Sequence, residues 1–524
     1  MAATTARVTG FLLSVLLSLC AAPAIGAEPA TRSTPQGPLL GLREADGVET
    51  FRAIPYALPP TGVRRWRPPE PAPAWTAVRD ARAFAPQCVQ QPYPPTSVFA
   101  RPDRPQSEDC LYLNVWTRAD AGADAPVMVW IHGGALTRGT GATESYDGSA
   151  LARKGAVVVT LNYRLGVFGF LAHPALSEES PLGVSGNYGY LDQIAALEWV
   201  RDNIAAFGGD PERVTIFGES AGSQSVNALM VTPCSRGLFH RAIGQSGAGF
   251  APKQRLETAH AGLRPAEAWG SDLSAALEAP SLDALRAVPA HDVLAQASRL
   301  AIPSSTVVDG VVIPDQPAAL FAAGRQHAVP VLLGFNADEG TSLTAPSSRP
   351  KEAAAYVQGV RERYADAADR FLEIYPADTP EASWLRAFRD GRFGWEMVRW
   401  ADATVQVDRP AWMYFFAHWP PGPYQAALRA YHAGEIRYVF DNTALSADAT
   451  ETDRALADLM SSYWVSFAQD GDPNGPGLPL WPRWDPSDRP HMVFDEESGP
   501  ETGLIDEATV FFDSLSPSAM VRAR

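Results

Sequence analysis

Residues 214–222 read Val-Thr-Ile-Phe-Gly-Glu-Ser-Ala-Gly, a β-branched run that leads into a serine flanked by two glycines. The run predicts a buried strand, and the segment Ser220–Met230 behind it predicts a helix. Gly218 and Gly222 permit a sharp turn and close packing, which would raise Ser220 at the helix N-terminus, where the dipole favours negative charge. This setting predicts a nucleophilic serine rather than an ordinary turn.

Similar apolar runs alternate with helical patterns elsewhere in the chain. Strands are predicted at Val127–Ile131, Val157–Leu161, Val214–Phe217, Val331–Leu333 and Met413–Phe416. A helix is predicted over Leu191–Phe207, where apolar residues recur at helical spacing. The alternation predicts an α/β fold with a mostly parallel central sheet flanked by helices.

A second glycine-rich segment, His132-Gly133-Gly134-Ala135, follows the first predicted strand. Small residues there leave backbone amides bare, as an oxyanion site requires. The segment alone fits a flexible turn equally well, but its place beside the serine motif favours the catalytic interpretation. We expect His132 to position this turn rather than to act as a base.

A serine hydroxyl needs a base to remove its proton and an acid to orient that base. The sequence contains nine histidines, and spacing alone does not select one of them as the base. No His or Cys spacing typical of a zinc site is present, so we expect neither a metal nor another cofactor.

The net charge and the N-terminal segment indicate which partners are excluded and in which compartment the protein works. The 524 residues carry a formal charge of −16 with no basic stripe, which argues against nucleic acid and anionic membranes as partners. Residues 1–27 are typical of an export signal, with Arg7, an apolar stretch over Phe11–Ala22 and small residues up to Ala27. We therefore expect a secreted or periplasmic protein with one catalytic domain over residues 28–524.

Further motifs extend along almost the whole mature chain. They are Phe-Arg-Ala-Ile-Pro-Tyr-Ala at 51–57, Ser-Glu-Asp-Cys-Leu-Tyr-Leu-Asn at 107–114, Asn-Tyr-Arg-Leu-Gly at 162–166, Gly-Asn-Tyr-Gly at 186–189, Phe-Gly-Gly-Asp-Pro at 207–211, Gly-Asp-Pro-Asn at 471–474 and Trp-Pro at 481–482. In this order they resemble the type-B carboxylesterase family, which includes cholinesterases and bacterial para-nitrobenzyl-type esterases. The stretch 168–193 also looks similar to secreted bacterial esterases that include fumonisin-degrading enzymes.

The resemblance implies an α/β-hydrolase fold and the chain order serine, acid, histidine. It assigns these roles to Ser220, Glu339 and His432; without it, Asp338 would be nearly as good a candidate for the acid. The implied oxyanion donors are the amides of Gly134, Ala135 and Ala221.

The family's first disulfide loop corresponds to Cys88 and Cys110, which leaves Cys234 as a thiol that we expect to be buried and unreactive. This chain departs from the family pattern at Leu136, where an aromatic residue is usual, and at Arg429 and Ala433, where glycine is usual.

The implied activity is that of a serine carboxylic ester hydrolase that forms an acyl-enzyme on Ser220 and acts on small-molecule esters. Two alternatives stay open: a non-catalytic cholinesterase-like binding module, and an amidase or lactonase on the same scaffold. The segments expected to wall the pocket, about 247–310, 341–350 and 385–425, carry no substrate code. Arginines such as Arg138, Arg392 and Arg399 either meet an anionic acyl group or are solvated surface charges.

Overall fold

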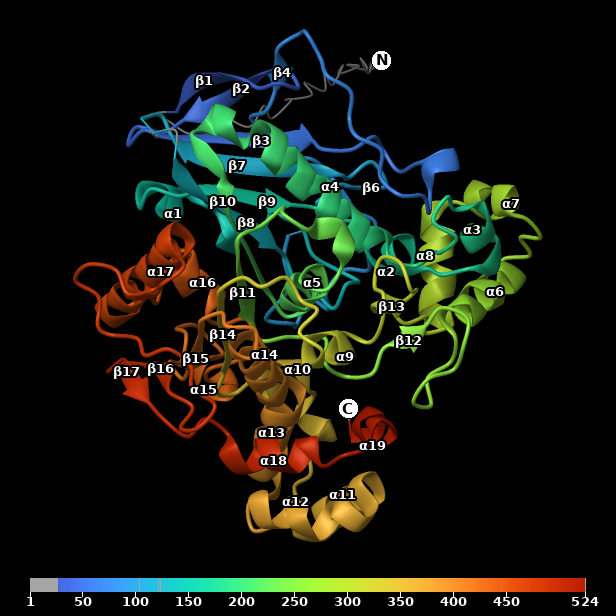
Figure 1. Cartoon of the computed structure of the whole chain (residues 1–524), viewed down its shortest axis with the longest axis vertical. Coiled ribbons are helices and arrows are strands. Elements are labelled where there is room, and N and C mark those ends of the chain that lie inside the picture. The colour runs from blue at the N-terminus through green and yellow to red at the C-terminus, as the bar shows by residue number, and fades with distance from the viewer. Residues whose placement is uncertain (1–26, 103, 121, 123, 524) are drawn as a thin grey trace, which may run out of the picture.

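A twisted sheet of 13 strands runs through the protein (Figure 1). The computed structural model describes residues 27–102, 104–120, 122 and 124–523. The predicted export signal therefore lies, apart from Ala27, outside the described residues. The strands of the sheet are β1 Glu28–Ser33, β2 Pro38–Arg43, β3 Val48–Pro55, β4 Arg79–Asp80, β7 Tyr112–Arg118, β8 Ala125–Ile131, β9 Val157–Leu161, β10 Gly209–Glu219, β11 Arg241–Gln245, β14 Val331–Asn336, β15 Ala411–Phe416, β16 His491–Phe494 and β17 Gly499–Glu501.

The strand order is β1-β2-β3-β7-β9-β8-β10-β11-β14-β15-β16-β17, with β4 paired to β2. All neighbours from β9 to β16 are parallel, whereas the pairs on either side of this block are antiparallel, except for the short parallel pair of β4 with β2. Two short pairs lie outside the sheet, β5 Gln87–Cys88 with β6 Gln106–Ser107 and β12 Gln254–Arg255 with β13 Val307–Val308. The predicted α/β class with a mostly parallel sheet is thus confirmed.

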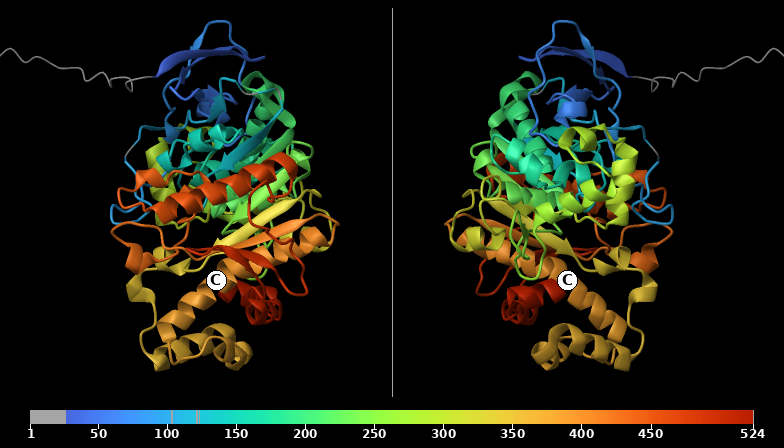
Figure 2. Two further views of the ribbon diagram at one scale, coloured as in Figure 1. Left: turned by 90° about the vertical axis from the view of Figure 1, so that its left-hand side faces the viewer. Right: turned by 90° about the vertical axis from the view of Figure 1, so that its right-hand side faces the viewer.

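Helices cover both faces of the sheet (Figure 2). They are α1 Ser149–Arg153, α2 Gly166–Phe170, α3 Pro174–Glu179, α4 Tyr188–Asn203, α5 Ala221–Leu229, α6 Ala266–Ala276, α7 Leu282–Ala287, α8 Ala290–Arg299, α9 Pro317–Ala322, α10 Gly340–Leu343, α11 Ala353–Tyr364, α12 Ala368–Ile374, α13 Pro380–Arg389, α14 Trp395–Val405, α15 Gln425–Leu428, α16 Ile436–Val439, α17 Glu451–Asp470, α18 Asp506–Asp513 and α19 Pro517–Ala523. A π-helical turn, Asp390–Gly394, joins α13 to α14.

Alternation along the buried strands sends side chains to two apolar cores. Val127 and Val129 of β8 pack in the core that includes α4, α5 and α14, whereas Met128 and Trp130 pack in the core that includes α17. Strands buried on both faces are the reason that the sequence shows unbroken apolar runs rather than an apolar-polar alternation. The strand predicted at Val157–Leu161 has these same bounds in the structure.

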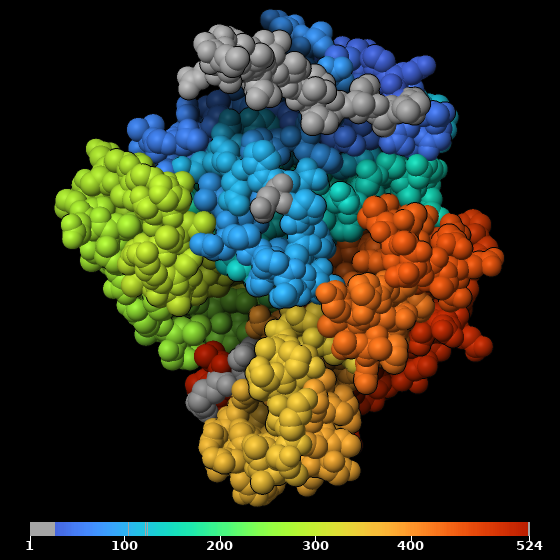
Figure 3. Space-filling model, turned by 180° about the vertical axis from the view of Figure 1, so that it is seen from behind, coloured from blue at the N-terminus to red at the C-terminus, as the bar shows by residue number. Residues whose placement is uncertain are grey.

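The carboxyl ends of β8, β10 and β14 lie at one edge of the sheet, where a parallel sheet presents its functional residues. Segments from distant parts of the sequence gather on one face of the protein (Figure 3). There the blue segment near residues 90–105 lies between the light green helices α6–α8, the gold helices α11 and α12, and an orange region near residues 425–450.

The predicted disulfide between Cys88 and Cys110 is present, with the two Cα atoms 5.0 Å apart. Cys234 was predicted to be buried, and that prediction is wrong, because the residue is exposed. It lies in a 3-10 turn, Pro233–Ser235, whose first two residues face outward and whose Ser235 alone is buried.

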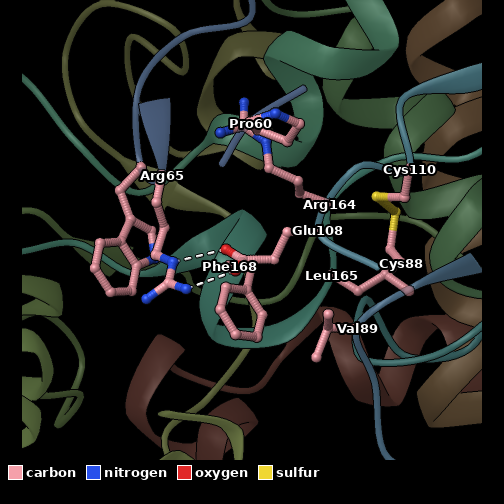
Figure 4. A pocket seen from close by; sticks show the side chains of 10 residues that line it. Pro60, Arg65, Cys88, Val89, Glu108, Cys110, Arg164, Leu165 and Phe168 are labelled. Carbon is pink, nitrogen blue, oxygen red and sulfur yellow. Dashed lines mark hydrogen bonds and ion pairs between the residues drawn. A yellow bond between two sulfur atoms is a disulfide. The ribbon is translucent and has the colours of Figure 1, made fainter. Parts of the chain in front are cut away.

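The disulfide borders a small hollow of about 10 Å³ (Figure 4). An ion pair lies beside it, in which the Arg65 guanidinium donates to both carboxylate oxygens of Glu108, at 2.6 and 2.5 Å. The hollow has room for about one water molecule, so it is a packing feature and not a substrate site.

Loss of the disulfide should destabilise the protein. A Cys88→Ala/Cys110→Ala variant releases a loop with a sequence separation of 22 residues, and the expected loss in free energy of unfolding is about 2–4 kcal/mol. Chemical denaturation followed by tryptophan fluorescence measures this loss. Cys234→Ala is the matched control and should change stability by less than about 0.5 kcal/mol. Equal stability of the double variant and the parent would contradict this expectation.

Candidate active site

Ser220 lies in the turn between β10 and α5 with φ 55° and ψ −120°, a left-handed conformation that non-glycine residues rarely adopt. Its amide donates to the carbonyl of Gln245 in the neighbouring strand β11, at 2.8 Å. A Cβ atom at Gly222 would lie 2.0 Å from the carbonyl oxygen of Ile131, so only glycine fits there. The turn therefore raises Ser220 at the carboxyl edge of the sheet, as the motif predicts.

His432 and Glu339 lie together, although 93 residues separate them in the sequence. The Nδ1 atom of His432 is 2.5 Å from Oε2 of Glu339, and both side chains are buried. The other carboxylate oxygen of Glu339 accepts the amide of Asn336 at 2.9 Å. Asp338 points elsewhere, because its carboxylate accepts the amide of Ala430 at 3.3 Å. The geometry thus pairs His432 with Glu339 and not with Asp338.

The Nε2 atom of His432 faces a second carboxylate, with Oε1 of Glu219 at 3.0 Å. Among the described residues, no hydrogen bond joins Ser220 Oγ to His432. Sequence reasoning did not assign a role to Glu219; the available signal was its place directly before Ser220. The imidazole therefore lies between two buried carboxylates.

These carboxylates control the charge of the ring. Burial alone would lower the pKa of His432, but Glu219 and Glu339 raise it well above its ordinary value. Burial raises the pKa of Glu219 itself, while the neighbouring imidazole acts in the opposite direction. In this arrangement the protonated imidazole is the favoured form.

A third buried carboxylate, Glu435, lies behind this group. It accepts hydrogen bonds from the side-chain amides of Gln245 at 2.9 Å and Asn336 at 2.6 Å. Burial, followed by repulsion from Glu219, raises its pKa to about 8. Because Asn336 also donates its backbone amide to Glu339, this one residue holds both acids in place.

The glycine-rich turn lies against the serine. A Cβ atom at Gly133 would lie 3.1 Å from Cβ of Ser220. Ala135 and the residue after it are both left-handed, with φ 57° and 58°. In the part of the chain that the structure describes, the amides of Gly134, Ala135 and Ala221 donate no hydrogen bond. Three predicted donors are thus unpaired near Ser220, as an oxyanion site requires.

His132 contacts the glycine-rich turn and holds it in place. Its Nδ1 atom lies 2.9 Å from the carbonyl oxygen of Gly133, and its ring stacks on Tyr163 at 4.5 Å between centroids. The Tyr163 hydroxyl donates to the carbonyl of His132 at 2.8 Å. Burial lowers the pKa of His132 to about 4, so the ring is neutral at pH 7. These contacts agree with the positioning role that the sequence analysis expected for His132.

Aromatic rings surround the imidazole of His432. The ring of Phe393, from the π-helical turn, lies 4.9 Å from it, and that of Phe99 lies 6.4 Å away. Tyr93 packs against Phe99, and its hydroxyl would lie 3.1 Å from a Cβ atom at Gly134. Tyr93 and Phe99 belong to the loop closed by the disulfide, and the sequence analysis assigned a role to neither of them.

A family model described as the carboxylesterase family matches residues 28–511. The chain belongs to the carboxylesterase family. It is 40% identical over 490 residues to the fumonisin B1 esterase of Sphingopyxis macrogoltabida. The aligned region covers 90% of this chain and 88% of the relative. It is also 37% identical over 492 residues to the para-nitrobenzyl esterase of Bacillus subtilis strain 168. Here the aligned region covers 89% of this chain and 94% of the relative.

Solved structures give the same result. A thermophilic para-nitrobenzyl esterase matches with a TM-score of 0.80 at 34% identity, over 92% of this chain and 99% of that one. The carboxylesterase EST55 of Geobacillus stearothermophilus matches with a TM-score of 0.79 at 35% identity, with the same coverage. The protein is therefore a carboxylic ester hydrolase with the α/β-hydrolase fold, as the sequence resemblance implies.

The three arginines singled out in the sequence of the esterase have different surroundings. Arg138 lies over the ring of Tyr93 at 5.2 Å and donates to the carbonyl of Gln91 at 3.1 Å. Arg399 pairs with Asp513, away from the serine turn. Arg392 is exposed and lines a separate cavity described below. Of the three, only Arg138 lies at the candidate active site.

The described residues of the esterase contain neither a cluster suited to a metal ion nor a helix suited to a membrane. No group of three or more His, Cys, Asp or Glu side chains among them is arranged to hold a metal ion. None of the helices in the described ranges is long and apolar enough to cross a bilayer.

Replacing Glu219 should change the titration of His432. Glu219→Gln removes a negative charge that favours the imidazolium, so the pKa of His432 should fall. NMR titration of ¹³C-labelled histidine rings measures the shift directly and needs no substrate.

Asp338→Asn is the matched control, because this carboxylate contacts the Ala430 amide and not the ring. It should shift the pKa of His432 much less than Glu219→Gln does. An unchanged or higher pKa in Glu219→Gln would contradict the electrostatic account.

Proposed function

We propose that this esterase hydrolyses small-molecule carboxylic esters through an acyl-enzyme on Ser220, with His432 as base and Glu339 as its acid partner. The observation that carries the proposal is the buried contact between His432 Nδ1 and Glu339 Oε2 at 2.5 Å, beside a serine raised on the strand-helix turn. An acid at Nδ1 fixes the tautomer of the imidazole and leaves Nε2 as the proton acceptor.

The reaction begins once the Nε2 proton of His432 passes to Glu219, whose pKa burial raises, and the neutral imidazole then shifts to the Ser220 hydroxyl and removes its proton. The serine oxygen attacks the ester carbonyl, and the imidazolium then protonates the departing alcohol. A water molecule activated by the same imidazole releases the acid and restores the serine. Glu339 stays ionised throughout and stabilises the charged ring.

Negative charge on the substrate carbonyl oxygen is held by the amides of Gly134, Ala135 and Ala221. Their lack of other partners in the described chain supports this role. Each such donor typically contributes about 3–4 kcal/mol to transition-state stabilisation. Ala221 also begins α5, so the helix dipole adds to the positive potential at this position.

The substrate range follows from the family only at the level of chemical class. The relatives act, by their names, on esters as different as fumonisin B1, para-nitrobenzyl esters and acylcarnitine. At 37–40% identity none of these substrates transfers to this chain on sequence grounds.

We also propose that residues 1–27 are an export signal and that residues 28–524 form the catalytic domain.

Exchanging the acid tests the proposed triad. Glu339→Gln should lower kcat/KM for p-nitrophenyl esters by about 10³–10⁴-fold. The reason is that the carboxylate no longer fixes the tautomer of the His432 ring or stabilises its positive charge. Asp338→Asn, the neighbouring carboxylate, should retain activity within about fivefold. Steady-state kinetics on both variants measures the contrast, and equal losses would refute the assignment of Glu339.

Removing the nucleophile tests the acyl-enzyme. Ser220→Ala should fold with an unchanged circular dichroism spectrum and lose at least about 10⁴-fold in kcat. Diethyl p-nitrophenyl phosphate should label the parent on the peptide that contains Ser220 and leave the variant unlabelled, as mass spectrometry will detect. Turnover by the variant at the parental rate would end the proposal.

Matched ester and amide substrates separate the amidase alternative, and absence of turnover in the parent would favour the binding module.

A further inference from the structure

A cavity of about 540 Å³ lies among the C-terminal helices, outside the candidate active site. Its walls come from α11, α12, α13, the π-helical turn, α18 and α19, which gather at the bottom of Figure 1. Figure 3 shows the red C-terminal segment beside the gold α11 and α12. The volume falls in the range of about 300–1,000 Å³ that is typical of small-molecule sites.

The cavity wall is apolar inside and positively charged at its edge. Aromatic rings form much of it, among them Trp384, Phe388 and Phe512. Arg363 and Arg392 also line it, and both are exposed. None of the described residues that line the cavity is acidic, although the chain as a whole carries a charge of −16. This combination matches a ligand with an apolar body and an anionic end.

A third lining arginine, Arg349, has a structural role. Its guanidinium donates to the carbonyls of Thr341 and Thr344 at 2.8 and 2.9 Å, and it pairs with Glu381 at 3.4 Å. These contacts occupy the side chain and hold the segment that follows α10. Arg349 is thus a structural part of the wall, whereas Arg363 and Arg392 are the lining cations that are exposed to solvent.

Gly359 lies in the middle of α11, where glycine costs about 1 kcal/mol of helix stability relative to alanine. It lines the cavity, and a Cβ atom built on it would meet no atom within 4 Å. No steric constraint in the described structure requires glycine here. The missing side chain leaves open space on the cavity side of the helix.

Two aromatic rings separate the cavity from the catalytic imidazole. Phe388 lines the cavity and lies 6.2 Å from Phe393 between centroids. Phe393 in turn lies 4.9 Å from the ring of His432. A ligand in the cavity is thus close to the active site but does not share its space.

From these observations we propose that the cavity is a second binding site, which takes an amphiphilic carboxylate with its chain among the aromatic rings and its carboxylate at Arg363 and Arg392. Carboxylates of this kind are also the products of ester hydrolysis, so the reaction itself supplies ligands of the right chemistry. The proposal does not depend on the mechanism at Ser220.

Calorimetric titration of the full chain with octanoate and with 1-octanol tests the site. The Arg363→Gln/Arg392→Gln variant should bind octanoate at least about tenfold more weakly and 1-octanol within about twofold of the parent. Gly359→Phe should place a ring in part of the cavity and weaken both ligands by at least about 20-fold. Gly359→Ala is the matched control, which should bind both ligands within about twofold of the parent.

Kinetics on p-nitrophenyl acetate serves as the folding check and locates the ligand. All of these variants should hydrolyse this small ester within about twofold of the parent. Competitive inhibition by octanoate at the active site should be the same in Gly359→Phe as in the parent, since the two sites are separate. The proposal is overturned if the parent binds no octanoate or if Gly359→Phe binds octanoate as tightly as the parent does. It is also overturned if, in Gly359→Phe, the inhibition constant for octanoate at the active site rises together with its dissociation constant. Because calorimetry needs no turnover, failure of the Ser220 mechanism would leave this result intact.

Discussion

The close approach of two backbones at the carboxyl edge of the sheet is the constraint on which the site depends. Strands β8 and β10 are parallel neighbours, and Ile131 at the end of one pairs with Gly218 of the other. Gly222 then passes so near Ile131 that no side chain fits between them. This approach strains the backbone at Ser220 and also brings the glycine-rich turn after β8 against it. One packing contact therefore shapes the nucleophile and its neighbouring amides together.

Charge at the site is balanced around a single buried imidazole. Glu339 and Glu219 contact its two nitrogen atoms, and each contact favours the protonated ring. A base held this way is more basic than a free imidazole, but it must leave Glu219 before it can serve Ser220. Because burial raises the pKa of Glu219, this carboxyl group is able to take the Nε2 proton and leave a neutral imidazole to serve Ser220.

Sequence reasoning succeeded where local rules are strong. The buried strands appear as unbroken apolar runs, and the bend at Ser220 follows from its two glycines. Glu339 and His432 came only through family resemblance, because no local pattern brings side chains 93 residues apart into contact. The aromatic wall of Phe99 and Tyr93 was missed, since a proline-rich loop has no periodicity that reveals which side chains point inward. The exposure of Cys234 was missed because composition does not report where a short turn faces.

The covalent link between Cys88 and Cys110 has a consequence for how selectivity arises. Ser220, Glu339 and His432 lie in turns outside the disulfide loop, whereas Phe99 and Tyr93 reach the same centre on the loop that the disulfide closes. Thiol oxidation therefore constrains the aromatic wall directly, and the three turns only through the rest of the fold. The same polypeptide made under reducing and oxidising conditions would share its reaction but differ in the walls that its substrates meet.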